Sequence, residues 1–163
     1  MLIDAILETA AGDVVSAASA LGGKVVALYF SAHWCPPCRQ FTPQLKAAYE
    51  EANKDGKQFE VVFVSSDNDA ASCASYMSEM HGDWLRLPFD SPLRAAFKTQ
   101  YGAFAGRERG NFPGVTRRDG IPAMVIVGPD GALQEFVSCE DGSDAISTTG
   151  GAAIAGWKKY AWP

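Results

Sequence analysis

Three apolar runs stand out along the chain, at residues 24–31, 59–65 and 121–127. Each run has the length of a strand, and none shows the strict alternation that marks a strand with one wet face. Strands that are apolar on both sides lie in a sheet that is covered on both faces. The pattern therefore predicts three central strands of one buried sheet.

Between these runs, apolar residues recur at helical spacing. Helices are predicted after Cys35, across residues 68–80, and from Ser91 to about Tyr101. The last of these starts with a capping serine followed by proline, a favoured way to begin a helix. Pro43 should kink the first helix, because its ring displaces one backbone hydrogen bond.

The flanking segments give weaker patterns. The second helix is expected to open at Ser66-Asp67, directly after its strand. The other expectations are a short helix over 2–10, an edge strand at 14–15, an apolar connection over 84–89, a hairpin turn at 128–131 with a returning strand over 133–138, and a helix over 145–157 that Gly150 and Gly151 interrupt. With helices between its strands and a hairpin at its edge, the chain should form an α/β fold with a mixed sheet.

Length and composition bound the class of protein. The chain has 163 residues, enough for a single domain over 1–163 but too few for two. It is 47% hydrophobic with a net charge of −5, which argues against general nucleic-acid binding. No apolar run approaches a membrane span, and the N-terminus lacks the basic region of a secretory signal. Four cysteines are too few for a disulfide scaffold, so a reducing, cytoplasmic compartment is expected. We also expect a monomer that binds neither nucleic acid nor membrane.

Two cysteines, Cys35 and Cys38, lie where the first predicted strand ends and a predicted helix begins. That context is typical of a redox dithiol. The N–H groups of a first helical turn are unpaired and carry partial positive charge, so they stabilise a thiolate placed beside them. Cys35, at the edge of the helix, is the predicted nucleophile. Cys38, one turn further in, is better shielded and can close a disulfide onto it.

Two other readings of the cysteine pair are a zinc half-site and a pair of structural thiols. Zinc needs four ligands, usually with a second Cys or His pair at short spacing. The remaining candidates are isolated from one another: Cys73, Cys139, His33 and His81. We therefore favour redox chemistry and predict no metal, flavin or nicotinamide site. Cys73 lies on an apolar helical stripe, and a buried, inert thiol is expected there.

The stretch Tyr-Phe-Ser-Ala-His-Trp-Cys-Pro-Pro-Cys-Arg-Gln-Phe-Thr-Pro at residues 29–43 resembles the thioredoxin superfamily. Trp-Cys-Pro-Pro-Cys, in place of Trp-Cys-Gly-Pro-Cys, resembles its tryparedoxin and nucleoredoxin branch. The resemblance continues in order through segments 59–67, 76–80, 87–89 and 120–122. It implies a thioredoxin-like fold, a central mixed sheet with helices on both faces. It also implies a cis Ile121–Pro122 bond facing the dithiol.

The same resemblance implies a thiol–disulfide oxidoreductase that reduces protein disulfides through a mixed disulfide, with Cys35 attacking and Cys38 resolving. Its substrate-binding residues would be Trp34, Pro36, Ile121 and Pro122. If the chain is like tryparedoxin, the reductant would be trypanothione and the acceptors would include peroxiredoxins. Ser66 stands where many tryparedoxins have Trp, which is closer to nucleoredoxin. The alternative is therefore a redox-sensitive adaptor whose dithiol gates partner binding.

Two further features each allow two interpretations. Tyr29, six residues before Cys35, takes the place of a buried Asp that helps move protons in many thioredoxins; it is either a core aromatic or a proton-handling group. Residues 102–120 are long, with five glycines and four arginines, where family members cross in a few residues. Long loops tend to be functional or disordered. We expect a flexible basic loop beside the dithiol that tunes partner choice, or else a tolerated surface insertion.

Overall fold

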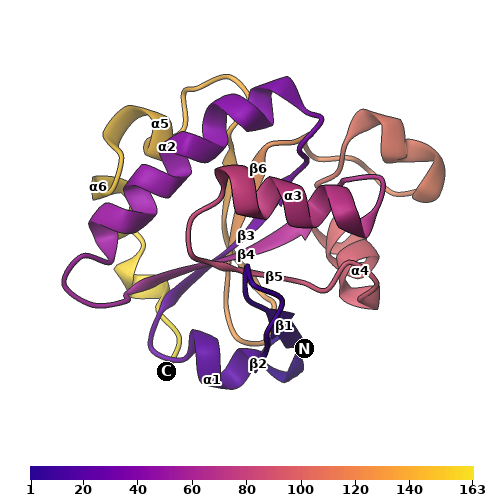
Figure 1. Ribbon diagram of the computed structural model, residues 1–163. Helices are drawn as coiled ribbons and strands as arrows, with labels where there is room; N and C mark the ends of the chain where they lie inside the picture. The colour runs from indigo at the N-terminus through magenta and orange to yellow at the C-terminus, as the bar shows by residue number, and fades with distance from the viewer.

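The computed structural model describes residues 1–163 and centres on one seven-stranded sheet (Figure 1). The strand order is β2-β1-β5-β4-β3-β6-β7. The strands are β1 Ile6–Glu8, β2 Val14–Ser16, β3 Val25–Ser31, β4 Phe59–Ser65, β5 Leu85–Arg86, β6 Ala123–Val127 and β7 Leu133–Ser138. β3, β4 and β5 are parallel neighbours, and the other neighbouring pairs are antiparallel. The predicted mixed sheet is thus confirmed.

Helices cover both faces of the sheet, as predicted (Figure 1). They are α1 Ala17–Leu21, α2 Pro36–Ala52, α3 Ala70–Met80, α4 Pro92–Tyr101, α5 Ala145–Thr149 and α6 Ala152–Ala155, with 3₁₀ turns η1 Leu2–Asp4, η2 Gly106–Asn111 and η3 Lys158–Tyr160. Alternate residues of β3 point into two separate cores. One core includes Leu21 of α1 and Phe97 of α4, and the other includes residues of α2, α3, α5 and α6.

The three central strands confirm the apolar runs, because every residue of β3, β4 and β6 is buried. β2 lies at the edge of the sheet and β7 returns antiparallel from its turn, also as predicted. α2 continues through Pro43 to Ala52, and Ser91 caps α4. No helix is both long enough and apolar enough to cross a membrane.

Two local predictions were wrong, one was incomplete and one was confirmed. Residues 2–10 form η1 and strand β1, because Leu7 is buried while Ile6 and Glu8 point away from the core. The connection over 84–89 contains the short strand β5. α3 begins at Ala70, two residues after the predicted start at 68, and its cap is Asp69 rather than Ser66-Asp67. The helical segment over 145–157 is interrupted at Gly150 and Gly151 as predicted: α5 ends where Gly150 takes a positive φ of 58°, and α6 ends at Ala155.

Candidate functional site

The dithiol lies at the N-terminus of α2, at the carboxyl end of β3. Cys35 is the N-cap residue, and Pro36 and Pro37 occupy the first helical positions. The two sulfurs are within bonding distance and the Cα atoms are 5.2 Å apart, a normal separation for a disulfide. The backbone N–H of Cys38 donates to Cys35 Sγ at 3.4 Å. Cys35 is 4% exposed and Cys38 is fully buried.

Ile121 and Pro122 directly precede β6, and this segment lies beside the start of α2. Their peptide bond is cis, as predicted. The carbonyl oxygen of Ile121 lies 3.8 Å from Cys35 Sγ. The fold therefore brings Cys35, Cys38 and Ile121 together from segments far apart in the sequence. Pro36 is exposed at the first turn of α2, and Pro122 is buried.

The two residues before Cys35 are fixed by the loop that follows β4. The N–H of His33 donates to Asp67 Oδ1 at 2.8 Å, and the indole N–H of Trp34 donates to the carbonyl of Ser66 at 3.0 Å. Ser65 Oγ donates to the second oxygen of Asp67. Burial raises the pKa of Asp67, and these hydrogen bonds oppose that shift. Asp67 thus holds the approach to the dithiol rather than opening a helix.

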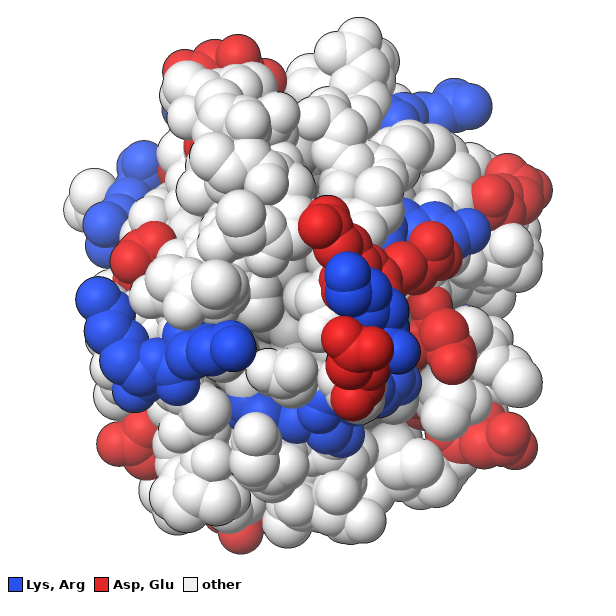
Figure 2. Space-filling model, turned by 90° about the vertical axis from the view of Figure 1, so that its left-hand side faces the viewer, with Lys and Arg blue, Asp and Glu red and all other residues white.

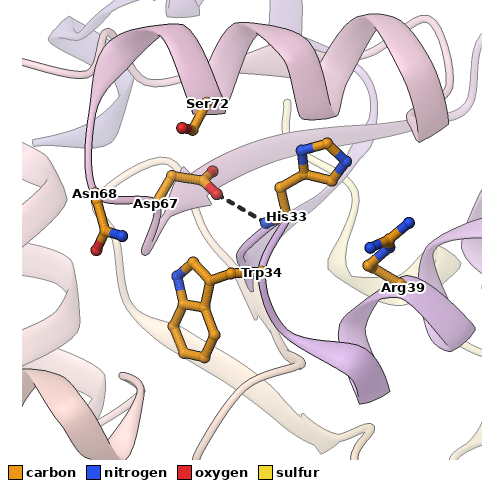
Figure 3. Close-up of a pocket in the computed structure, with 6 residues that line it drawn as sticks. All are labelled: His33, Trp34, Arg39, Asp67, Asn68 and Ser72. Atoms are coloured by element: carbon orange, nitrogen blue, oxygen red, sulfur yellow. Dashed lines mark hydrogen bonds between the residues drawn. The ribbon is translucent and has the colours of Figure 1, made fainter.

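A surface pocket of about 250 Å³ opens beside the dithiol (Figure 3). Its lining comes from three places: the loop before α2, α2 itself, and the segment from β4 into α3. The lining residues are His33, Trp34, Arg39, Asp67, Asn68 and Ser72. The imidazole of His33 stacks on Tyr76, with ring centroids 5.1 Å apart, and lies 3.2 Å from the carboxylate of Glu79. The pocket is therefore mostly polar, and the His33 ring in its wall is held in place by Tyr76 and Glu79.

A buried hydroxyl network lies under the first turns of α2. Thr42 Oγ1 donates to the carbonyl of Cys38 at 2.8 Å and is hydrogen-bonded to the hydroxyls of Tyr29 and Tyr76. The Tyr76 hydroxyl also bonds Ser31 at 2.7 Å. Burial raises the pKa of Tyr29 well above its usual value. Tyr29 therefore remains protonated at neutral pH, and its place is that of a core aromatic with a satisfied hydroxyl.

The segment 102–120 lies beside the dithiol and is folded rather than structureless. It contains η2, and its two ends meet where Ala103 pairs with Asp119. Glu108 ties it to the rest of the protein: one carboxylate oxygen lies 2.6 Å from Lys98 Nζ, and the other accepts from Ser66 Oγ. Arg107 places its guanidinium 3.5 Å from the centre of the Trp34 ring. The predicted position of this segment beside the dithiol is confirmed, whereas the expectation of a structureless, flexible loop is not.

The other two cysteines, Cys73 and Cys139, are free and buried, which confirms the expectation for Cys73. Burial raises the pKa of the Cys73 thiol. The pKa of Cys139 is raised well above its usual value, first by burial and then by nearby carboxylates such as Asp144. The structure contains no cluster of three or more His, Cys, Asp or Glu residues that could hold a metal ion.

Sequence reasoning missed the residues that hold this site in place. Asp67 was predicted to open a helix, and Glu108 was not singled out within the segment 102–120. Lys98 did carry a signal, since it shares the buried stripe of α4 with Phe97 and Tyr101. A lysine at such a position needs a buried partner. The sequence does not say which carboxylate supplies it, because the partner lies in a different segment.

The geometry defines a thioredoxin-fold protein with a redox dithiol at a helix start. A thioredoxin-like family model matches residues 22–133, and the chain belongs to that family. Probable nucleoredoxin 1 from Arabidopsis thaliana is 39% identical over 113 residues, which cover 69% of this chain and 17% of that protein. The chain spans about a fifth of the length of the nucleoredoxins it matches.

Solved structures agree with this assignment. Thioredoxin from Wuchereria bancrofti is 38% identical with a TM-score of 0.68, covering 96% of this chain and 89% of that one. A structure of tryparedoxin II complexed with glutathionylspermidine is 31% identical with a TM-score of 0.60, covering 98% and 92%. The chain is thus a member of a redox family, with relatives in both the nucleoredoxin and tryparedoxin groups.

Proposed function

We propose that this protein is a thiol–disulfide oxidoreductase that reduces protein disulfides, with Cys35 as the attacking thiol and Cys38 as the resolving thiol. The observation that carries the proposal is the position of Cys35 at the N-cap of α2, where its sulfur accepts the N–H of Cys38. N–H groups at a helix start stabilise a thiolate, and the thiolate is the nucleophile. Cys38 is fully buried, so an incoming disulfide meets Cys35 first.

The reaction balances without a cofactor. The Cys35 thiolate attacks one sulfur of the substrate disulfide, which breaks that bond and releases the other sulfur as a thiolate. The Cys38 thiolate then attacks Cys35 Sγ and frees the second substrate sulfur. Two electrons have passed to the substrate, and the Cys35–Cys38 disulfide remains. An external dithiol must reduce that disulfide before the next turn.

Four residues around the sulfurs would contact the substrate: Trp34, Pro36, Ile121 and Pro122. Trp34 is half-buried and Pro36 is exposed, so both offer apolar surface next to Cys35. The N–H and C=O of Ile121 pair with no other backbone group of the protein. An extended substrate segment could therefore add its own backbone hydrogen bonds there, as a strand adds to a sheet edge.

The donor and acceptors are proposed from the relatives. The tryparedoxin complexed with glutathionylspermidine supports a small dithiol such as trypanothione as the reductant. Peroxiredoxins are the proposed acceptors among protein disulfides. We also propose that the protein acts in the cytoplasm, because a cycling dithiol suits a reducing compartment, and that it acts there as a monomer.

The alternative is a redox-sensitive adaptor, which the nucleoredoxin matches favour. Ser66, which takes the place of the tryparedoxin Trp, accepts the indole N–H of Trp34 through its carbonyl and binds the 102–120 segment through its hydroxyl. In this alternative, oxidation of the dithiol would change what that combined surface binds, and turnover would be secondary.

Steady-state reduction of a protein disulfide, with dithiothreitol as the donor, separates these functions. The oxidoreductase predicts many turnovers per molecule and a stable mixed disulfide in Cys38→Ser. Cys73→Ser is the matched control, because it removes one thiol away from the helix start. A single stoichiometric reduction, with no further turnover while donor remains, would favour the adaptor.

A further inference from the structure

Arg107 presents a positive charge next to the dithiol that the protein does not neutralise. Its guanidinium lies over the ring of Trp34, the residue directly before Cys35, 3.5 Å from the ring centre. The residue is exposed, and no carboxylate in the structure forms an ion pair with it. A guanidinium stacked on an aromatic face keeps its edge N–H groups free for a carboxylate. The charge is therefore available to a partner.

Glu108, the acid next to Arg107 in the sequence, is not free to form an ion pair with it. Both oxygens of Glu108 are occupied, one by Lys98 and the other by the hydroxyl of Ser66 and the N–H of Ala105. Lys98 is 2% exposed, so the Lys98–Glu108 pair is a buried attachment rather than a loose surface contact. Because Ser66 also accepts the indole N–H of Trp34, the same residues position both members of the Arg107–Trp34 stack.

The other acids of the site are also engaged. Asp67 accepts the N–H of His33 and the hydroxyl of Ser65, and Glu79 faces the imidazole of His33. Elsewhere the surface is mixed: the face turned away from the 102–120 segment shows Lys, Arg, Asp and Glu interspersed (Figure 2). In a protein of net charge −5, a free cation fixed beside the nucleophile is a local feature of the site.

We propose that Arg107 is a specificity-determining residue that selects disulfide-bearing polypeptides with a carboxylate side chain next to the half-cystine that Cys35 attacks. This inference rests on the proposed oxidoreductase function. Arg107 pairs with the carboxylate while Cys35 forms the mixed disulfide. It takes no part in bond making, so a neutral disulfide of the same shape reacts at a rate that does not depend on Arg107.

The test uses two synthetic peptides, each with one internal disulfide, that differ by Glu or Gln next to the attacked cysteine. Pre-reduced full-length protein is mixed with oxidised peptide, and peptide thiols are counted after acid quenching. Arg107→Gln should lower the rate constant for the Glu peptide about two- to fivefold, the range expected for an exposed ion pair. The rate constant for the Gln peptide should stay within about 1.5-fold, because it forms no such pair.

Arg109→Gln is the matched control: it makes the same charge change within η2, and Arg109 lines a hollow with Phe104 and Phe112 rather than stacking on Trp34. It should keep the wild-type ratio of the two rate constants. Raising the salt concentration should lower that ratio in the wild type and leave it flat in Arg107→Gln. Equal ratios in wild type and Arg107→Gln, or an equal drop in Arg109→Gln, would overturn the inference. If the wild type reduces neither peptide, the proposed function itself fails.

Discussion

Cys35 and Cys38 lie at the start of α2, whereas Cys73 lies within α3 and Cys139 follows β7. Exposure does not separate the two pairs, because Cys35 is 4% exposed and Cys139 is 3% exposed. What differs is the group that faces the sulfur. Cys35 accepts an N–H from the first turn of a helix, but the Cys139 thiol donates to the carbonyl of Val137.

The group that faces each sulfur also determines whether the thiol or the thiolate is favoured. A helix start favours a thiolate, whereas burial beside carboxylates such as Asp144 holds the pKa of Cys139 well above its usual value. Cys73 is held neutral by burial in the same core as Cys139. Two thiols with nearly equal exposure can thus differ in reactivity because of their hydrogen bonds and neighbouring charges.

The largest effect should come from exchanging single cysteines. Cys35→Ser should abolish reduction of a protein disulfide, because serine cannot form the mixed disulfide. Cys73→Ser and Cys139→Ser should keep the wild-type rate constant within about twofold, provided that they remain folded. Steady-state rates with dithiothreitol as donor measure this. The comparison fails if either buried cysteine is needed for turnover.

The core around Cys73 also keeps His81 neutral, and this makes stability depend on pH. Burial lowers the pKa of His81 to about 3, against about 6.5 in an unfolded chain. The unfolded state binds this proton first, so stability should fall as pH drops from about 6.5 towards 3, by on the order of 4 kcal/mol. The raised pKa values of Asp67 and Glu60 act in the opposite direction.

His81→Gln isolates this contribution, because glutamine can still accept the indole N–H of Trp84 that His81 accepts. The difference in unfolding free energy between wild type and variant should shrink as pH falls through that range. Urea unfolding at several pH values gives this difference. A difference that is constant from neutral to acidic pH would show that His81 is not held neutral by the core.

The charged groups on the dithiol side should matter next. Glu108→Gln removes the partner of buried Lys98 and should cost about 3 kcal/mol of unfolding free energy, as breaking a buried pair does. Lys98→Met combined with Glu108→Gln should recover part of that loss, because no buried charge is left unpaired. A double-mutant cycle measures the coupling. If the losses of unfolding free energy in the two single variants add up in the double variant, Lys98 and Glu108 do not stabilise each other.

The smallest effect should be the loss of stability from trimming a buried thiol. Cys73→Ala should cost about 1 kcal/mol, a typical value for a single core substitution that creates little space. Its redox rate should not change. Thermal unfolding of the variant beside wild type gives the cost. A loss far larger than this would indicate that the thiol does more than fill the core.

The residues that the sequence predicted best were those whose signal is local. The buried runs of β3, β4 and β6 and the helix start at Cys35 can each be recognised within about ten residues. β1 was missed because three residues hold too little pattern, and its strand character comes from pairing with β2 and β5. The attachment of Glu108 to Lys98 and Ser66 joins three distant segments, so no local pattern carries it.

The order in which the thiols of the reduced protein react tests the role of Cys35 most directly. A limiting amount of an alkylating reagent is added at neutral pH, and the labelled cysteine is identified by peptide mass spectrometry. Cys35 should be labelled first, Cys38 later, and Cys73 and Cys139 only after unfolding. First labelling of Cys38, or of either buried cysteine in the native protein, would contradict the assignment of Cys35 as the nucleophile.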